Sequence, residues 1–453
     1  MPDDYQPRQR IAIVGGGFSG TSLIAAIQRE CKHSIEIILC EKTGCFGPGE
    51  AYKTPLPYHL LNVRACDMSI YADEPAHFAT WLMQQKNLLE ELGIELPVEK
   101  QFLPRMLYGK YLQQILQSIT QDPSSLIKLS FVPEQVLDIV SRTDSLELKF
   151  ANHYPLQVDQ VVLALGNGQP DTFPFSVDNN VQCINNPWDY TAVNAIPSHD
   201  TVLIVGTGLS MIDTVLTLHH QQHHGKIIAL SRHGLLPLPH AEIQPLHISS
   251  ELPTNVRSMT TYLRKMSRNH DWRSMITALR AHVPELWQGW HISCQKRFLR
   301  HVLPYWNIHR HRVHQALSDL LQDLIASQQL TVMAGRIQRV KNGNAYIKPR
   351  HSEKIAEISV NWLINCMGPS LSMSGQTQPL ISSLLKQGVA TFDALKLGFA
   401  VSESGALQDK DGNISTQFFT LGPPAKGKIW EATAVPEIRL HSKRLAQHLL
   451  NHH

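Results

Sequence analysis

The residues of this chain best suited to chemistry, by type and spacing, are glycines. Gly15, Gly17 and Gly20 follow the apolar run IAIV, and the helical pattern TSLIAAIQRE comes next. In a GxGxxG turn the first glycine permits a tight bend, the second lets the backbone approach a pyrophosphate, and the third lets helix and strand pack closely. The run IEIILC predicts the next strand, and Glu41 directly after it can bind both hydroxyls of a ribose. This order predicts a dinucleotide site; the alternative is a glycine turn that only packs.

A second glycine turn differs from the first in two ways. Gly206 and Gly208 follow the apolar run VLIV, but Met211 stands where a third glycine would be, so we expect this helix slightly farther from its strand. The next apolar run, KIIAL, ends at Ser231 and Arg232 with no acid. A carboxylate would repel a 2′-phosphate, whereas a serine and an arginine accept one. The pattern predicts a site that prefers NADP; the alternative is that Arg232 is an ordinary solvated arginine.

Two further segments, VDQVVLALG (158–166) and VNWLINCMG (360–368), align without a gap. Each follows short alternating stretches typical of half-buried strands: LIKLSF, VLDIVSR and LELKF in the first half, and LTVMA, IQRVKNG and AYIKP in the second. The sequence therefore predicts an α/β fold with two Rossmann-like units. Each would consist of a βαβ unit, a β-meander and a buried strand ending in glycine.

On these turns, and on the stretches GPGEAY, HLLNV, RFLRHVLPYWNIHRHR and WEATAVPEIR, the whole chain resembles flavoproteins with two dinucleotide-binding domains. It is most similar to uncharacterised bacterial FAD/NAD(P)-binding proteins and is distantly similar to N-hydroxylating flavin monooxygenases. The resemblance implies FAD at the first turn and NADPH at the second. It implies an FAD-binding domain formed by residues 1–180 and 371–453, and an NADP-binding domain at 181–370 with a helical insertion at about 235–330.

The resemblance also assigns individual residues. Those expected at FAD are Gly15, Gly17, Ser19 and Gly20 at the pyrophosphate, Glu41 at the ribose, Val136 at the adenine, Gly166 closing the unit, and also Lys42 and Ala434. Those expected at NADPH are Gly206, Gly208, Ser210, Ser231 and Arg232. Weaker candidates near the flavin ring are His59, Asn62 and Trp430, and none of them is given a proton-transfer role.

The C-terminal stretch ATAVPEIRLHSKRLAQHLL predicts a helix with Pro436 in its first turn. In the flavoproteins that the chain resembles, such a helix points its N-terminus at the flavin, where its dipole stabilises the reduced anion. The alternative is a helix that only faces the core.

Three departures from the family limit what the resemblance implies. Cys40 and Cys45 have the spacing CxxxxC, but Cys40 precedes the ribose acid and is expected at a buried strand end, so a redox pair is not expected. CINNPWDY (183–190) lacks the histidine of the FxGxxxH[ST] motif, which makes flavin-containing and Baeyer–Villiger monooxygenases doubtful relatives. Gly422 and Pro423 replace the glycine-aspartate pair that binds ribitol in the reductases.

Residues 235–330 carry more chain than a crossover needs and are dense in Trp, Arg and His. Three interpretations stay open: a lid that binds an acidic or planar substrate, a basic nucleic-acid surface, or a helical bundle with Trp in its core and cations in solvent. His309 and His311 lie two apart, which on a helix points them in different directions, so we expect no metal site.

Composition sets the class of protein. The 453 residues are 43% hydrophobic and 17% charged with a net charge of +3, which indicates a globular chain and favours neither nucleic acid nor a membrane surface. Seven irregularly spaced cysteines and an N-terminus without an apolar core favour a cytoplasmic protein with reduced thiols. We expect an FAD-dependent NADPH oxidoreductase, either a monooxygenase that oxygenates a small-molecule nucleophile or a reductase or dehydrogenase without oxygen transfer. A third alternative is a non-catalytic FAD/NADP-binding sensor or interaction protein. Substrate and oligomeric state stay open.

Overall fold

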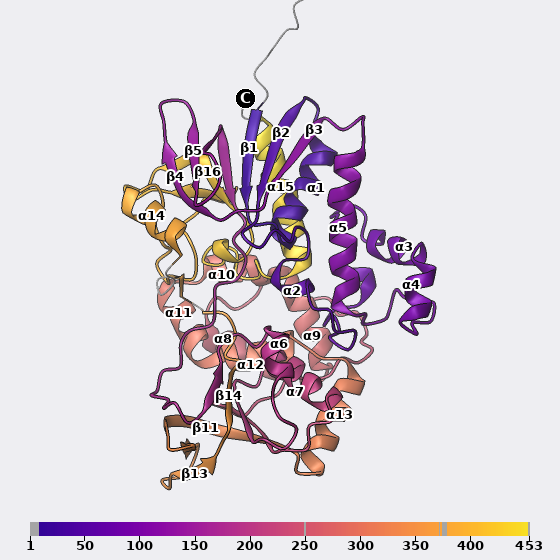
Figure 1. The fold of residues 1–453 in the computed structure, drawn as a ribbon, viewed down its shortest axis with the longest axis vertical. Coiled ribbons are helices and arrows are strands. Elements are labelled where there is room, and N and C mark those ends of the chain that lie inside the picture. The colour runs from indigo at the N-terminus through magenta and orange to yellow at the C-terminus, as the bar shows by residue number, and fades with distance from the viewer. Residues whose placement is uncertain (1–8, 249–250, 371, 374–377, 452–453) are drawn as a thin grey trace, which may run out of the picture. The chain divides into compact units, whose positions relative to one another are not determined.

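The computed structural model describes residues 9–248, 251–370, 372–373 and 378–451. The chain divides into two compact units (Figure 1): unit 1 comprises Met1–Gly168 and Leu371–His453, and unit 2 comprises Gln169–Ser370. Unit 1 is thus built from both ends of the chain and unit 2 from its middle. Within the described ranges, no helix is both long and apolar enough to cross a membrane.

Unit 1 contains a six-stranded sheet in the order β15-β16-β7-β1-β2-β3. The bounds of its strands are β1 Gln9–Val14, β2 Ile35–Cys40, β3 Ile127–Val132, β7 Gln160–Leu163, β15 Ala406–Gln408 and β16 Ile414–Thr420. β1 lies between β2 and β7 and pairs with both in parallel, and β16 pairs in parallel with the other edge of β7. The C-terminal segment therefore completes the sheet that the first residues begin.

The two faces of this sheet bury different layers, as the alternation of side chains along β1 requires. Ile11 and Ile13 belong to the core that includes helices α1 (Phe18–Glu30), α5 (Arg105–Gln121) and α15 (Val435–Asn451). Ala12 and Val14 belong to a second core, shared with α14 (Pro379–Gln387) and the three-stranded meander. The meander strands are β4 (Val136–Ser141), β5 (Leu146–Phe150) and β6 (Leu156–Val158). The shorter elements of unit 1 are α2 Gly49–Tyr52, η1 Ala65–Asp67, α3 His77–Met83, α4 Lys86–Glu91 and η5 Pro423–Ala425.

Unit 2 contains a seven-stranded sheet in the order β13-β12-β11-β10-β9-β14-β8. The bounds of its strands are β8 Gln182–Ile184, β9 Val202–Val205, β10 Ile227–Ser231, β11 Leu330–Lys341, β12 Asn344–Pro349, β13 Ala356–Ser359 and β14 Trp362–Asn365. The α/β fold with two Rossmann-like units, each with a meander, is confirmed. Its helices outside the insertion are α6 (Tyr190–Asn194) and α7 (Leu209–His220).

The meanders of the two units differ in one respect that the sequence pattern did not predict. LTVMA and IQRVKNG, expected as two strands, form the single strand β11, which pairs in parallel with β10 and then antiparallel with β12. In unit 1 the equivalent strands β3 and β4 are separate, and Pro133 follows directly after β3. Proline has no N–H for the ladder and ends a strand, whereas Gly335 in β11 lets the strand continue through its change of partner.

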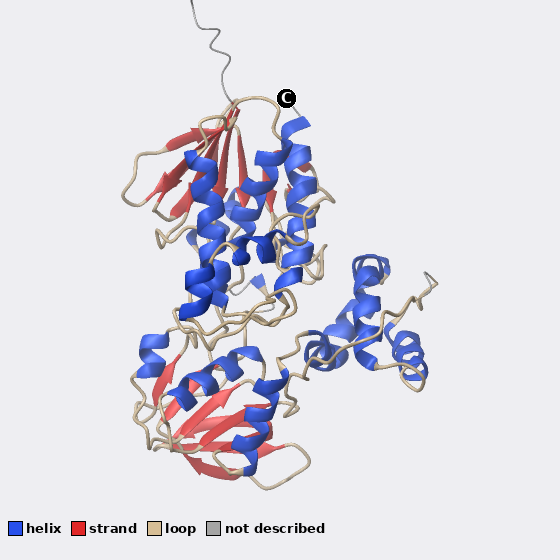
Figure 2. Cartoon of the chain, turned by 90° about the vertical axis from the view of Figure 1, so that its right-hand side faces the viewer, coloured by secondary structure: helices blue, strands red, loops and turns tan. Residues whose placement is uncertain are grey.

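Helices make up the insertion of unit 2, as predicted (Figure 2). Their bounds are α8 Val256–Met266, α9 Trp272–Leu279, η2 Arg280–His282, α10 Val283–Gly289, α11 Ile292–Arg297, η3 Phe298–Val302, α12 Leu303–Arg310 and α13 Gln315–Ala326. Trp287 and Trp306 are buried and lie near the ring of buried Phe298. This part of the insertion is therefore a helical bundle with tryptophan in its core.

A buried histidine makes the stability of unit 1 depend on pH. His441 of α15 is 5% exposed, and burial, helped by the charge of Arg444, lowers its pKa from 6.5 to about 4. Above pH 6.5 the imidazole is neutral whether the chain is folded or not; below it, only the unfolded chain takes up the proton, until the folded pKa is reached. We expect the free energy of unfolding to fall by about 2 kcal/mol from pH 7 to pH 5 through this group.

Denaturant titrations of the parent protein and of His441→Gln at both pH values test this. Between pH 7 and pH 5, the free energy of unfolding of His441→Gln should fall by about 2 kcal/mol less than that of the parent. His153→Gln is the control, because the imidazole of His153 is exposed to solvent in the folded chain as well as in the unfolded one. Equal pH dependence in parent and His441→Gln would contradict the expectation.

Candidate functional site

The first glycine turn joins β1 to α1 at the carboxyl end of the unit 1 sheet. Gly15 has a φ of +117°, a conformation that favours glycine, and its N–H donates to the carbonyl of Cys40 at 2.8 Å. A side chain on Gly15 would run into the carbonyl oxygen of Ala164, and one on Gly20 would run into that of Gly15. The first and third glycines thus have the roles that the sequence predicts for them: a tight bend and close packing of helix on strand.

The start of α1 lies directly after the first glycine turn. Gly17 is its N-cap, in an extended conformation, and no side chain caps the helix. The space in front of Gly17 is bounded by Gly49, and a side chain on Gly49 would come within 2.9 Å of the Cα of Gly17. Ser19 is buried, and its hydroxyl faces Gly422. A helix start with free N–H groups and two facing glycines fits a pyrophosphate.

Glu41 lies over this turn. One carboxylate oxygen accepts the N–H of Gly16 at 2.9 Å, and the other accepts the N–H and the hydroxyl of Thr43 at 3.1 and 2.9 Å. The carboxylate is thereby fixed beside the pyrophosphate position with one of its four lone-pair sites left for a ribose hydroxyl, so these residues fit the adenosine half of FAD. Lys42, next to it, is exposed.

The other residues expected at FAD lie on different parts of unit 1. Val136 begins β4 and pairs with Phe150, and Gly166 follows β7 with a φ of +70°. The carbonyl of Ala434, just before α15, accepts the N–H of Ile438 at 3.0 Å. Pro436 is the second residue of that helix, as predicted.

The three weaker candidates have different surroundings. His59 is fully buried, and its Nδ1 lies 3.0 Å from the hydroxyl of Thr54, so its ring is held within the protein. Asn62 is half-buried. Trp430 is 5% exposed, and the ammonium of Lys426, whose pKa burial lowers, lies 4.9 Å from its ring. A role of these groups at the flavin stays a prediction.

Cys40 ends β2 and is 1% exposed, as the sequence predicts. Burial raises the pKa of its thiol to about 12. A thiol of that kind does not form the thiolate that disulfide exchange needs.

The second turn reproduces the first. Gly206 has the same φ of +117°, its N–H donates to the carbonyl of Leu230 at 2.8 Å, and a side chain on it would run into the carbonyl oxygen of Cys366. The internal repeat is thereby confirmed, because Cys366 aligns with Ala164. Gly208 caps α7 with φ −88° and ψ −164°, close to the values of Gly17, and no side chain caps the helix.

Side chains mark the difference between the turns. Met211, at the place of the third glycine, is fully buried, so this turn leaves room for a side chain there. Ser231, at the end of β10, stands where Glu41 stands in unit 1. Its hydroxyl oxygen accepts hydrogen bonds from the hydroxyl of Thr207 and from the N–H of Gly234, each at 2.9 Å. The second turn thus ends in a small neutral group. Ser210, in the first turn of α7, is half-buried.

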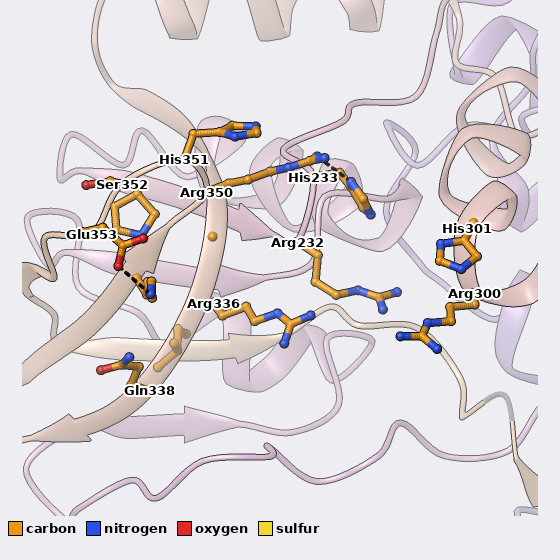
Figure 3. A pocket seen from close by; sticks show the side chains of 14 residues that line it. Arg232, His233, Arg300, His301, Arg336, Gln338, Arg350, His351, Ser352 and Glu353 are labelled. Carbon is orange, nitrogen blue, oxygen red and sulfur yellow. Dashed lines mark hydrogen bonds and ion pairs between the residues drawn. The ribbon is translucent and has the colours of Figure 1, made fainter.

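Arg232 lines a pocket of about 720 Å³ within unit 2 (Figure 3). The other cations lining it are Arg300, Arg336, Lys348 and Arg350. Arg336 and Lys348 are directly opposite each other on β11 and β12, an arrangement of like charges that is unfavourable without an anion. The pocket has the electrostatics of a phosphate site. Of these cations, the sequence predicts a ligand contact for Arg232 alone; Arg300 belongs to the insertion, for which the sequence leaves three interpretations open.

The chain matches one protein family over part of its length and several solved structures over nearly all of it. Residues 12–168 match a family described as FAD-NAD(P)-binding. No curated protein matches the chain. Among solved structures, the Kutzneria sp. 744 ornithine N-hydroxylase has a TM-score of 0.68 at 14% identity, covering 98% of this chain and 99% of that one. The reduced ornithine hydroxylase from Pseudomonas aeruginosa has a TM-score of 0.66 at 13% identity, with coverage of 98% and 99%. The bacillithiol disulfide reductase from Staphylococcus aureus has a TM-score of 0.59 at 12% identity, covering 98% of both chains.

These identities are low, so the likeness concerns the fold. The two glycine turns share the φ of their first glycine, and each begins a βαβ unit that has its own meander. A fold with two such units can bind two nucleotides. The chain therefore has the fold of the flavoproteins with two dinucleotide-binding domains, and its residues 12–168, which match the FAD-NAD(P)-binding family, lie in unit 1.

Proposed function

We propose that this chain is an FAD-dependent oxidoreductase that oxidises NADPH. The observation that carries the proposal is the difference between two otherwise equal turns. A carboxylate, Glu41, lies over the first, and the neutral Ser231 beside Arg232 ends the second. The first suits a nucleotide with a free ribose, as in FAD, and the second suits one with a 2′-phosphate, as in NADPH.

Unit 1 would hold FAD with the N–H groups at the start of α1 on the pyrophosphate and Glu41 on the ribose. Unit 2 would hold NADPH with α7 on the pyrophosphate and Arg232 on the 2′-phosphate. FAD supplies the ability to accept a hydride and pass its electrons on, which explains why the chemistry needs no catalytic triad from the chain. Seven free cysteines support a reducing compartment, and we propose the cytoplasm.

For the electron acceptor, we propose oxygen together with a small nucleophilic substrate such as an amine. Support comes from the fold likeness to an ornithine N-hydroxylase and to an L-lysine 6-monooxygenase. The likeness to a bacillithiol disulfide reductase makes a reductase the second candidate. The burial of Cys40 argues against a dithiol pair in this chain as the acceptor in such a reaction.

Anaerobic titration of the flavin-loaded protein with NADPH tests the proposal. Stepwise addition should bleach the visible flavin absorbance, and NADH at equal concentration should do so more slowly. Dithionite is the control that shows the flavin to be reducible. Flavin that dithionite bleaches and NADPH does not would overturn the proposal and leave a non-catalytic protein that binds FAD and NADP as a sensor or interaction partner.

A second experiment separates oxygenase from reductase. The NADPH-reduced protein is exposed to oxygen in the presence of a panel of small amines, and products are examined by mass spectrometry. A monooxygenase adds one oxygen atom to one of the amines in step with NADPH oxidation. Oxygen converted entirely to hydrogen peroxide with every amine would favour the reductase.

A further inference from the structure

Three separate segments meet at the cationic pocket of unit 2. The end of β10, the β11–β12 hairpin and the helical insertion each line it. Their lining cations are Arg232 from the first, Arg336, Lys348 and Arg350 from the second, and Arg300 from the third. In Figure 3 the side chains of Arg232 and Arg300 extend toward each other from opposite walls. The insertion therefore contributes directly to the site where the 2′-phosphate would bind.

The pocket has more positive charge than its own side chains neutralise. Among the described residues that line it, Glu353 is the one acid, and it pairs with Lys348 at 3.2 Å. Arg350 donates to Nδ1 of His233 at 2.6 Å, which requires the imidazole of His233 to be neutral. The pKa of His233 is lowered, mainly by burial and also by the charges of the neighbouring arginines. Three further guanidinium groups remain, from Arg232, Arg300 and Arg336, and a dianionic phosphate is the group that such a set of planar donors binds.

The turn that carries Arg300 is joined to the aromatic core of the insertion. Arg300 and His301 lie in η3, a π-helical turn, and such turns are frequent at functional sites. Phe298, two residues before Arg300, places its ring 6.1 Å from that of Trp287 and 5.7 Å from that of Trp290. On the pocket side, the ring of Tyr305 in α12 lies 5.7 Å from that of His233. A ligand held by Arg300 is thus mechanically connected to the insertion.

We propose that Arg300 is a specificity-determining residue for the 2′-phosphate of NADPH, and that its contact with this phosphate transmits cofactor binding to the helical insertion. The proposal rests on the proposed function, since it takes NADPH as the ligand of unit 2. It gives the insertion a role that its tryptophan core alone does not explain. NADPH would order the η3 turn, and NADH, which has no 2′-phosphate, would leave it unchanged.

Affinity measurements on the flavin-loaded protein test the specificity. Isothermal titration with NADP⁺ and NAD⁺ is carried out on the parent, on Arg300→Gln and on Arg297→Gln. Arg297 is the matched control because it is exposed on the adjoining α11 and does not line the pocket. Arg300→Gln should bind NADP⁺ about tenfold more weakly, the effect of one lost charge-assisted hydrogen bond at an exposed site, with NAD⁺ unchanged. Equal weakening in both variants would overturn the assignment.

Hydrogen exchange tests the transmission. In the parent, NADP⁺ should slow amide exchange across 298–310, and NAD⁺ at equal saturation should not. In Arg300→Gln, saturating NADP⁺ should still protect 206–212 at the glycine turn but no longer 298–310. NADP⁺ that protects the turn and leaves 298–310 unchanged in the parent would overturn the inference while leaving the proposed function intact. A parent that binds neither nucleotide would overturn both.

Discussion

Gly206→Ala should give a protein that keeps its flavin and that NADPH reduces very slowly. A side chain at this position would run into the carbonyl oxygen of Cys366, and the φ of +117° is one that residues with side chains rarely adopt. The turn and the start of α7 must then move away from the position proposed for the NADPH pyrophosphate. Backbone strain of this kind costs about 3 kcal/mol, so we expect the anaerobic reduction rate at fixed NADPH to fall on the order of hundredfold. Stopped-flow flavin absorbance measures it.

Gly15→Ala is the matched variant, because its side chain would meet the carbonyl oxygen of Ala164 at the same φ. It should purify without flavin. Together the two variants separate the cofactor sites, since each alters one turn and leaves the other as it is. Dithionite should reduce the flavin of Gly206→Ala as fast as that of the parent. If NADPH also reduced it at the parental rate, the second turn would not be the NADPH site.

Ser231→Glu should reverse the nucleotide preference. The substitution places a carboxylate where unit 1 has Glu41, beside the group that would bind the 2′-phosphate. Like charges brought together at a binding site cost several kcal/mol, so we expect KM for NADPH to rise on the order of hundredfold while KM for NADH changes little. Steady-state oxidation of both nucleotides measures the effect.

Ser231→Gln separates charge from size. Its amide is as large as the carboxylate of glutamate and meets the same neighbour, Thr207, but it carries no charge. It should raise KM for NADPH far less than Ser231→Glu does. Arg232→Ala completes the set, because it should raise KM for NADPH without raising that for NADH. Equal effects of the glutamate and glutamine variants would mean that crowding, not charge, governs this position.

The parts of the site that could be predicted from sequence are local. Gly15, Gly17 and Glu41 all lie within one βαβ unit, so strand, turn and helix fix their positions over a short stretch. The internal repeat also predicts the position of Ser231, because the strand of unit 2 that corresponds to β2 ends at that residue. The single strand β11 could not be anticipated, because its pairing with both β10 and β12 depends on neighbours elsewhere in the fold.

The cationic pocket shows why the remaining site residues were missed. Asn342 and Gly343 both have positive φ, and an Asn-Gly pair in a sequence predicts a hairpin turn. Pairing residues outward from this turn correctly matches β11 with β12 as far as Arg339. Between Arg339 and Ile337 the register shifts, and this irregularity is what sets Arg336 opposite Lys348. Arg300 reaches the pocket through the packing of the insertion, which no local pattern in its own helix encodes.

The path of the chain through the two units determines when each can form during synthesis. Unit 2 is one continuous segment and can fold as soon as it leaves the ribosome. Unit 1 must wait, because β16 pairs with β7 and the side-chain amide of Gln9 donates to the carbonyl of Leu449 at 3.0 Å. Until then β7 has an open edge, which is a site for aggregation. In a chain made from its N-terminus, the unit proposed to hold FAD is therefore complete only after β16 and α15 have been made.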